Sequence, residues 1–377
     1  MGVRSTTRRI LGAVVLLVLL LVAVASYVLS MPQFGGKLQG DELERARHSA
    51  HYRDRMFVNV VPQAGYQWAE IWQMFSAQMF GKEVRVPPSA IPVVAVAPDS
   101  LKTLLPAPAL RAFWIGHASV FIELDGVRML VDPIFSDYAS PFEMGPKRFH
   151  PPPIALADLP PIDAVMVTHD HYDHLDMHTV QHLAGKGTLF LVPLGIGAHL
   201  KKWGVPEAQV RALEWWQEHK VKDVRFVATP SRHYSGRGLS DKNATLWTSW
   251  SVLGAKHRFY VSGDTGYADH FRAIGDKFGP FDLAFIKIGA YGPSESWHDI
   301  HMGAEEAVQA NVDVRAKRMF PVHWGTFNLA FHDWDEPVKR ALVAARVLKV
   351  DLLTPRVGEM VDADQPFQST AWWEAVR

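Results

Sequence analysis

The sequence predicts a mixed α/β fold (α+β type) of stacked β-sheets covered by helices, preceded by one N-terminal transmembrane helix. Three observations lead to this prediction. β-rich runs alternate with helical runs from about residue 110 onward, polar loops follow several of the β-rich runs, and the uncharged run Ile10 to Leu29 lies near the N-terminus. We therefore expect three regions: a membrane anchor or signal sequence at 1–30, a linker with helical and extended segments at 31–109, and a folded domain at 110–377.

The N-terminal segment has the features of a membrane-spanning helix. Ile10 to Leu29 is 20 residues long, and about 20 apolar residues in a helix span the hydrocarbon core of a bilayer. Arg4, Arg8 and Arg9 precede this run, so that flank should stay cytoplasmic while the rest of the chain is exported. Ala23-Val24-Ala25 also offers a signal-peptide cleavage pattern. Because the apolar run continues beyond it, we favour an uncleaved single-pass anchor.

The linker region should contain two helices and an extended arm. Gly35-Gly36-Lys37 reads as a flexible linker, 41–51 as a charged and solvated helix, and 84–108 as a Pro-rich arm leading into the sheet. An aromatic, Met-rich helix is expected over 66–80. One face of this helix is apolar and contains Trp68, Ile71, Trp72 and Phe75. We expect this face to pack on the folded domain; the alternative is that it lines an acyl-chain groove or rests on the bilayer surface.

The folded domain alternates strands and helices. Strands are predicted at 111–124, 127–131, 164–168, 189–192, 224–229, 246–253, 257–261 and 283–288. Helices are predicted at 174–183, 195–203, 268–274, 304–312 and 337–348. Such a mixture is typical of stacked sheets with helices on their outer faces.

The loop His169 to His174 packs three histidines and an aspartate into six positions, in the pattern H-x-H-x-D-H. It directly follows the apolar run 164–167, and the period of a strand lets His169 and His171 point the same way. Imidazole and carboxylate are ligands of Zn²⁺ and similar ions. The alternative is a polar, His-rich loop at a strand end. We favour a metal site, in which Asp173 and His174 aim at a neighbouring point and one loop serves two adjacent metals.

Further candidate ligands follow other β-rich runs. His233 comes after the run at 224–229, Asp264 after 258–261, and His323 after 319–322. Each lies beside Gly or Pro, where functional loops on a rigid sheet are found. Singly, each histidine reads as a hydrogen-bonded core residue and Asp264 as a turn residue. Together with the loop they supply seven ligands, enough for two ions of which one keeps an open position.

The order of these residues resembles that of the metallo-β-lactamase-fold hydrolases. The flanking strings resemble one branch, the N-acylphosphatidylethanolamine-specific phospholipases D and their bacterial relatives. The strings are Phe113 to Ser119, Val131 to Ser136, Gly145 to Phe149, Leu159 to Val165, Gly263 to Tyr267 and His323 to Phe327. The similarity covers roughly 110–340 and implies a four-layer αββα sandwich, with a hydrolase domain at 110–377 and metals at one edge of its sheets.

The resemblance also implies a ligand set with two Zn²⁺ ions per chain. It places one zinc on His169, His171 and His233 and the other on Asp173, His174 and His323, with Asp264 bridging both. His301 matches a histidine that lines the family's active site near the scissile phosphate. The alternative for His301 is a residue at the start of the helix that follows it.

The implied mechanism uses two metals roughly 3.5–4 Å apart, which activate a bridging hydroxide for attack on a phosphodiester. Asp173 and Asp264 are expected to orient this hydroxide and so to be catalytic as well as ligating residues. The leaving group needs an acid, and either His301 or a metal-bound water can supply the proton. The sequence does not choose between them.

Composition and the anchor reduce the range of candidate substrates and cellular locations. Lys and Arg total 39, as do Asp and Glu, so no global basic field attracts nucleic acid. We expect a phospholipid substrate, a phosphodiesterase of phospholipase D type in lipid metabolism, and a bacterial inner-membrane protein with its catalytic domain on the periplasmic side. The absence of cysteine fits export. Whether the chain forms a homodimer is left open at this point.

Two other functions remain as alternatives: a dizinc hydrolase of another substrate such as a lactone, and a non-enzymatic metal-binding envelope protein. Structural zinc sites are usually closed and four-coordinate, which argues against the second. The remaining histidines are expected to be ordinary surface or core residues; they include His150, His182, His199, His219, His257 and His270.

Overall fold

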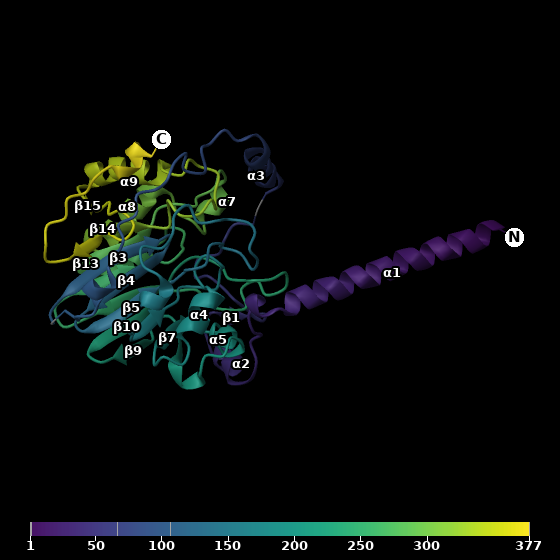
Figure 1. Ribbon diagram of the computed structural model, residues 1–377, viewed down its shortest axis with the longest axis horizontal. Coiled ribbons are helices and arrows are strands. Elements are labelled where there is room, and N and C mark those ends of the chain that lie inside the picture. The colour runs from purple at the N-terminus through teal and green to yellow at the C-terminus, as the bar shows by residue number, and fades with distance from the viewer. Residues whose placement is uncertain (1, 66, 106, 377) are drawn as a thin grey trace.

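Two seven-stranded β-sheets form the body of the protein in a computed structural model that describes residues 2–65, 67–105 and 107–376 (Figure 1). The strand orders are β16-β3-β4-β5-β6-β7-β8 and β15-β14-β13-β12-β11-β10-β9. Each sheet contains three antiparallel and three parallel neighbouring pairs. The two halves therefore share one topology, and β16 from the C-terminal half completes the N-terminal sheet.

The strands of the first sheet are β16 (Met360–Asp362), β3 (Leu110–Gly116), β4 (Ser119–Leu124), β5 (Val127–Val131), β6 (Ala164–Met166), β7 (Leu189–Pro193) and β8 (Val210–Leu213). Those of the second are β15 (Asp351–Leu352), β14 (Ala316–Val322), β13 (Phe281–Lys287), β12 (Arg258–Val261), β11 (Ser249–Leu253), β10 (Val224–Thr229) and β9 (Glu218–Val221). A small hairpin, β1 (Tyr52–Arg53) and β2 (Met56–Phe57), stands apart.

The central strands are buried on both faces, which explains their continuous apolar runs. In β3, Ala112 and Trp114 belong to the large core that also contains residues of the other sheet, such as Phe226 and Trp250. Phe113 and Ile115 belong to a second core on the opposite face. The period-two alternation of β3 therefore divides its side chains between the two cores.

Helices cover the outer faces and complete a four-layer arrangement of helices, sheet, sheet and helices. The helices of the domain are α4 (Met177–Leu183), α5 (Gly197–Lys202), α6 (His270–Phe278), α7 (Glu295–His298), α8 (Ala304–Asp313) and α9 (Glu336–Leu348). Val180 of α4 and Leu200 of α5 pack in the outer core of the first sheet. Phe271, Ala307 and Val338, from α6, α8 and α9, join the core of the second sheet.

The predicted elements are found with shifted ends, and the strand predicted over 111–124 was wrong as a single element. It folds back into β3 and β4, which pair antiparallel around a turn at His117 and Ala118. Gly116 and His117 both have positive φ, 123° and 53°, so the chain reverses there, and the turn signal given by Gly116 was missed. The short strands β8, β9, β15 and β16 were not predicted, because two to four residues carry little periodicity.

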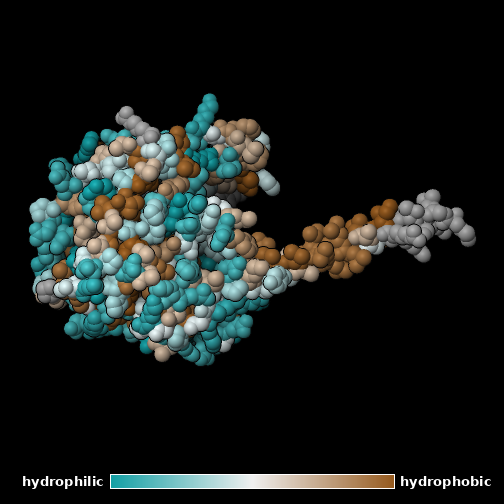
Figure 2. Space-filling model, in the orientation of Figure 1, coloured by the Kyte–Doolittle hydropathy of each residue, from teal (hydrophilic) through white to brown (hydrophobic). Residues whose placement is uncertain are grey.

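The N-terminal helix α1 (Gly2–Ser30) projects away from the body (Figures 1 and 2). By length and composition, Ile10–Ser30 is able to cross a membrane, and none of its described apolar side chains is buried. Figure 2 shows it as a hydrophobic rod beside a largely hydrophilic body. This exposure is the state expected of a helix whose natural surroundings are hydrocarbon.

The segment predicted as a flexible linker, Gly35-Gly36-Lys37, is instead docked on the body. The backbone N–H of Gly36 donates to Nδ1 of His199 at 2.9 Å, and Nζ of Lys202 donates to the carbonyl of Gly35 at 2.9 Å. The charged helix predicted at 41–51 is α2 (Gly40–Arg47) and ends earlier, before the hairpin of β1 and β2. In the described part of the arm predicted at 84–108, which excludes residue 106, the one helical segment is the 3₁₀ turn Pro98–Leu101.

The aromatic helix is α3 (Trp68–Phe80), and its predicted start at Tyr66 lies outside the described residues. We expected its apolar face to pack on the domain, and this was wrong: none of the described side chains of α3 is buried. Trp68 is 86% exposed and Trp72 65% exposed. The helix is tied to the body by polar contacts instead, for example the N–H of Ser296 donating to Oε1 of Glu70 at 3.0 Å. Its apolar face is therefore open.

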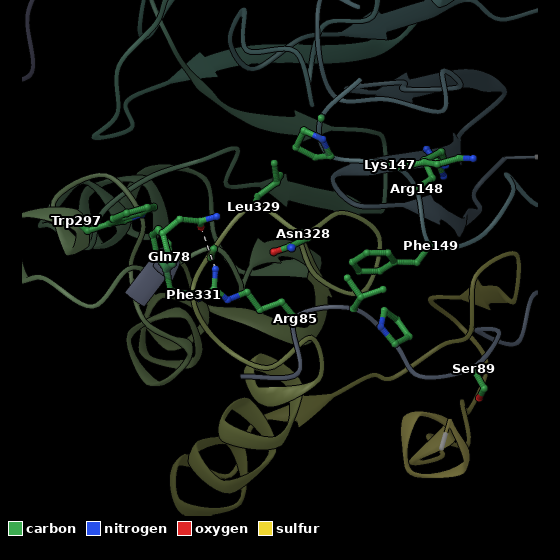
Figure 3. A pocket seen from close by; sticks show the side chains of 15 residues that line it. Gln78, Arg85, Ser89, Lys147, Arg148, Phe149, Trp297, Asn328, Leu329 and Phe331 are labelled. Carbon is green, nitrogen blue, oxygen red and sulfur yellow. Dashed lines mark hydrogen bonds between the residues drawn. The ribbon is translucent and has the colours of Figure 1, made fainter. Parts of the chain in front are cut away.

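A groove of about 790 Å³ separates α3 and the arm from the loops that follow β5 and β14 (Figure 3). Arg85, Lys147 and Arg148 bring positive charge to its wall, and Phe149, Trp297 and Phe331 bring aromatic surface. A narrower pocket shares Arg85, Phe149 and Leu329 with this groove and is also lined by His117 and His323. The groove thus leads toward the histidine-rich edge of the two sheets.

Candidate metal centre

The candidate metal-ligating side chains come from loops at one shared edge of the two sheets. His169 follows β6, His233 follows β10, Asp264 follows β12 and His323 follows β14. The strands β12, β13 and β14 run parallel, as do β5, β6 and β7, so their carboxyl ends meet at this edge. The structure therefore brings together residues that lie up to about 150 positions apart in the chain.

The first cluster consists of His169, His171 and His233. Nε2 of His169 lies 2.8 Å from Nδ1 of His171, and Nε2 of His233 lies 3.4 Å from the same atom. The outer nitrogen of His233 donates to the carbonyl of Ile300 at 2.9 Å. That bond leaves Nε2 of His233 with its lone pair toward the cluster, the arrangement of a metal-ligating imidazole.

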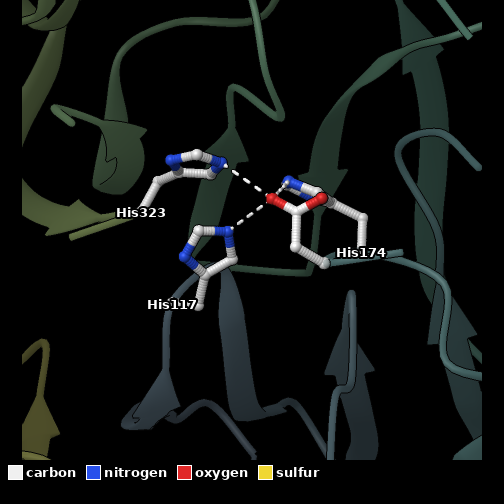
Figure 4. Close-up of side chains that lie close together, drawn as sticks. His117, His174 and His323 are labelled. Atoms are coloured by element: carbon white, nitrogen blue, oxygen red, sulfur yellow. Dashed lines mark hydrogen bonds and ion pairs between the residues drawn. The ribbon is translucent and has the colours of Figure 1, made fainter. Parts of the chain in front are cut away.

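The second cluster consists of Asp173, His174 and His323, and it includes His117, which the sequence did not indicate (Figure 4). Oδ2 of Asp173 lies 2.8 Å from Nε2 of His117 and 3.4 Å from Nε2 of both His174 and His323. Figure 4 shows the three imidazoles converging on one carboxylate. The N–H of His323 also donates to the carbonyl of His117 at 2.9 Å, which ties the two turns together.

Asp264 lies between the two clusters. Its Oδ2 is 3.0 Å from Nε2 of His323 and 3.4 Å from that of His174 in the second cluster. It is 3.9 Å from Nε2 of His233 and 4.0 Å from that of His169 in the first. A single buried carboxylate thus faces both groups, which is the position expected of a bridging ligand.

Asp132 is not a member of the ligand clusters, but it hydrogen-bonds to residues of the centre. Its carboxylate accepts hydrogen bonds from Nδ1 of His174 at 2.8 Å and from the N–H and Oγ1 of Thr168, each at 2.7 Å. Asp132 is fully buried at the end of β5. It fixes the tautomer and the orientation of His174, and it anchors Thr168, the residue directly before His169.

The charges of the cluster are arranged to hold cations. Burial disfavours the imidazolium of His174, but the carboxylates of Asp264, Asp173 and Asp132 outweigh burial and raise its pKa well above 6.5. Burial likewise opposes ionisation of Asp264, yet neighbouring charge from His323, His174 and His301 holds its pKa well below 3.8. The buried carboxylates thus favour positive charge at this point of the structure, and a divalent ion supplies such charge when its ligands deprotonate to bind it.

The unsatisfied polar atoms at the centre also fit a metal. Among the described residues, Nε2 of His174, Nε2 of His323 and Oδ1 of Asp264 are buried without a hydrogen-bond partner. Buried polar groups normally have partners, and orphaned ones cost free energy. Imidazole nitrogen and carboxylate oxygen are suitable donors for Zn²⁺ and related divalent ions. The residues present therefore fit the binding of divalent metal.

His301 is brought to the edge of the centre, as the sequence suggested. Its Nδ1 lies 3.7 Å from Oδ2 of Asp264, and its ring centroid lies 5.1 Å from that of His233. Burial, reinforced by the positive charge of Lys287, lowers the pKa of His301 well below 6.5. It precedes α8, which begins at Ala304, so it is not part of that helix.

Two residues at the centre were missed from the sequence. His117 sits in the turn between β3 and β4, where its signals were the preceding Gly116 and a polar residue inside an apolar run. Lys287 is a fully buried lysine in β13, and burial lowers its pKa to about 8 against the opposing effects of Asp264 and Glu306. Its signal is a lysine in the apolar run Phe285-Ile286-Lys287-Ile288, a position that normally carries a hydrophobic side chain.

We expect replacement of His117 by alanine to weaken divalent-metal binding by about 10- to 100-fold, the usual cost of losing a group that orients a ligand. The reason is that Asp173 would lose its 2.8 Å hydrogen bond and become free to rotate away from the second cluster. Competition with a chromophoric chelator measures the affinity. His178→Ala, at an exposed histidine in α4, is the control. Equal affinities in both variants and wild type would rule out this role for His117.

The fold and the centre define the class of protein as a metal-dependent hydrolase of the metallo-β-lactamase superfamily. Residues 127–324 match the family described as Beta-lactamase superfamily domain, and the chain belongs to this family. The predicted metallo-β-lactamase fold is confirmed.

Two relatives are similar to this chain over most of its length. It is 37% identical over 291 residues to the N-acyl-phosphatidylethanolamine-hydrolyzing phospholipase D 1 of Caenorhabditis elegans, a match that covers 73% of this chain and 81% of the relative. It is 44% identical over 339 residues to an uncharacterized protein of Mycobacterium tuberculosis, covering 87% and 88% of the two chains. The predicted resemblance to the N-acylphosphatidylethanolamine phospholipase D branch is confirmed.

Solved structures share the fold at low sequence identity. The metallo hydrolase Igni18 of Ignicoccus hospitalis superposes with a TM-score of 0.52 at 21% identity, covering 69% of this chain and all of that one. An isothiocyanate hydrolase from Delia radicum gut bacteria gives a TM-score of 0.54 at 19% identity, covering 67% and 98%. These similarities show the fold; the fold and the cluster of His and Asp imply divalent-metal binding.

Proposed function

We propose that the protein is a dizinc phosphodiesterase that hydrolyses an N-acylphosphatidylethanolamine-like phospholipid at a membrane surface. The observation that carries the proposal is the pair of ligand clusters on either side of Asp264. A pair of metals suits an in-line displacement at phosphorus, because it can contact both the attacking and the leaving oxygens. The 37% identity to the phospholipase D of C. elegans supports a phospholipid over other phosphodiesters.

Bound divalent ions would supply Lewis acidity and lower the pKa of water toward neutrality. The protein's own residues would hold the ions and position the water and the substrate. Asp173 and Asp264 would hold the ions and orient the attacking water, since the partly buried Asp173 and the buried Asp264 lie among imidazoles that lower the pKa of each carboxyl well below 3.8. His301, at the open edge of the centre, would contact a phosphoryl or leaving-group oxygen. Water and phospholipid would then give phosphatidic acid and an N-acylethanolamine, with the water's second proton transferred to the leaving oxygen.

The groove beside the centre supports a lipid substrate. Its volume of about 790 Å³ falls within the range of roughly 300–1,000 Å³ typical of ligand pockets. Figure 3 shows Arg85, Lys147 and Phe149 among the side chains around it. Cationic and aromatic groups on one wall suit a molecule that joins a phosphate to apolar chains.

The anchor and α3 support a membrane location. In Figure 1, α3 and α1 lie on the same side of the body, and Figure 2 shows apolar surface at both. With its aromatic face open, α3 would rest on the bilayer beside the anchor, the second of the two roles considered for it. The anchor would cross the inner membrane of a bacterium once, with the domain on the periplasmic side.

The test is the release of phosphatidic acid from N-acylphosphatidylethanolamine by the full-length chain in detergent micelles or nanodiscs. Plain phosphatidylethanolamine and a lactone are assayed in parallel, each before and after metal removal and zinc reloading. We expect zinc-dependent release from the N-acylated lipid. His301→Ala should lower kcat by about 10²- to 10⁴-fold without changing metal content, the range typical of acid–base residues. His298→Ala, three residues away and paired with Glu306, is the matched control.

Two results would contradict the proposed reaction, and a third would contradict only the role given to His301. Hydrolysis of lactones without phospholipids would identify a different substrate class. A zinc-loaded chain that cleaves none of these esters would favour a structural metal site. Full activity in His301→Ala would remove this histidine from the site while leaving the reaction itself in place.

A further inference from the structure

A hydrogen-bonded path joins the segment that leaves the membrane anchor to the loop that carries His169 and His171. The N–H of Gly36 donates to Nδ1 of His199 at 2.9 Å. Nε2 of the same imidazole lies 3.3 Å from Oδ2 of Asp170, the residue between the two candidate ligands. His199 is buried, so this path runs through the protein interior.

Asp170 is held by additional donors. Its carboxylate accepts hydrogen bonds from the N–H of Gly236 and from Oγ1 of Thr245, each at 2.8 Å. The carboxylate is thus fully used in fixing the backbone of the metal loop and is not among the ligand clusters.

Arg237 makes a second connection between the same two segments. Its Nη1 donates to the carbonyl of Asp170 at 2.6 Å and to that of Leu175 at 3.0 Å, at the two ends of the metal loop. Its Nε and Nη2 donate to the carbonyl of Gln33 at 3.1 and 3.0 Å. The buried guanidinium stacks on Tyr172 at 4.0 Å, which fixes its plane. One cation therefore binds the metal loop and the membrane-proximal chain together.

Two adjacent glycines let the chain approach closely enough for these bonds. A Cβ on Gly36 would overlap the carbonyl oxygen of Ala198, and one on Gly35 would overlap the ring of His199. Gly35 also has φ of 78°, which favours glycine. Nε1 of Trp203 donates to the carbonyl of Pro32 at 2.7 Å and secures the segment one turn earlier.

We propose that residues 31–37 are a positioning element of the metal centre, with His199 and Arg237 as positioning residues. The segment sets the backbone of the metal loop, and through it the placement of His169 and His171. Small displacements of ligands reduce metal affinity. We therefore expect the docking of this segment to affect the metal affinity of the centre. The inference concerns the metal loop and does not depend on which ester the protein cleaves. It also fixes where the anchor leaves the body, directly beside that loop.

The test compares Gly36→Ala with Gly65→Ala in the full-length chain. A Cβ on Gly36 must push the segment away from α5, whereas a Cβ on Gly65 meets no described atom within 4 Å. We expect Gly36→Ala to bind zinc about 10- to 100-fold more weakly, by chelator competition. Hydrogen–deuterium exchange of residues 168–175 in the metal-free protein should become faster in this variant and stay unchanged in Gly65→Ala.

A second variant covers the case in which Gly36→Ala does not fold. His199→Asn keeps a polar side chain but is too short to reach both Gly36 and Asp170, and it should show the same two changes to a smaller extent. His182→Asn, at a histidine on α4, is its control. Unchanged zinc affinity together with unchanged exchange in either folded variant would overturn the proposal. Neither readout uses lipid hydrolysis, so failure here is distinguishable from failure of the proposed reaction.

Discussion

Replacing Asp264 by asparagine should lower the rate of metal-dependent hydrolysis by more than about 100-fold, because losing even an outer partner of a ligand costs 10- to 100-fold. Asp264 faces the imidazoles of both clusters, within 3.0–4.0 Å of four ring nitrogens. Asparagine has almost the same shape but no negative charge, so it cannot balance two divalent ions. We expect the variant to retain at most one tightly bound metal per chain, measured by elemental analysis after dialysis.

The matched control is Asp269→Asn, five residues further along and exposed at the start of α6. It removes the same charge from the same segment without touching the centre, and both its metal content and its turnover should equal those of wild type. Wild-type turnover in Asp264→Asn would exclude a reaction that depends on both metals. Circular dichroism of the metal-free proteins shows whether the variant is folded.

Replacing Asp132 by alanine should reduce the free energy of unfolding of the metal-free protein by about 3–5 kcal/mol, the cost of breaking a buried ion pair from one side. Three donors lose their acceptor at once: Nδ1 of His174 and the N–H and Oγ1 of Thr168. None of them can turn to solvent, because both residues are buried. Denaturant unfolding in the presence of a chelator measures the change.

Asp158→Ala is the control for this prediction, since Asp158 is exposed in the connection between β5 and β6. An exposed substitution of this kind should change stability by no more than about 0.5 kcal/mol. If Asp132→Ala unfolds at the same denaturant concentration as Asp158→Ala, the support that we assign to Asp132 is wrong. Zinc affinity should also fall in Asp132→Ala, because His174 loses its fixed orientation.

Much of the centre could be predicted from the sequence because its ligands lie just beyond strongly apolar runs. The H-x-H-x-D-H loop is local, so its spacing alone indicated a metal site. His233, Asp264 and His323 were found because each follows a strand whose residues are buried on both faces. His117 had no such signal: its strand continues directly into the next one, and only the reversal of the chain brings it to Asp173.

In the N-terminal region, by contrast, the sequence did not predict the contacts that the structure shows. Gly35 and Gly36 are typical of a flexible linker, and their composition contains nothing about the surface on which they dock. The complementary groups, His199 and Arg237, lie more than 160 residues away, so the hydrogen bonds exist only in the folded chain. The sequence likewise did not predict that the apolar face of α3 is exposed, because periodicity predicts an apolar face but not whether other residues cover it.

The sequence by itself determined the apolar N-terminal span, the two-faced strands of the sheets and the identity of seven candidate ligands. These features depend on residue type and short-range spacing, which need no knowledge of the fold. Tertiary structure alone decided that Asp264 lies between two clusters, that His117 and Lys287 belong to the centre, and that residues 31–37 are bonded to the loop that carries His169 and His171. Each of these depends on residues far apart in the chain, and their proximity is fixed by packing of the two sheets and not by local preference.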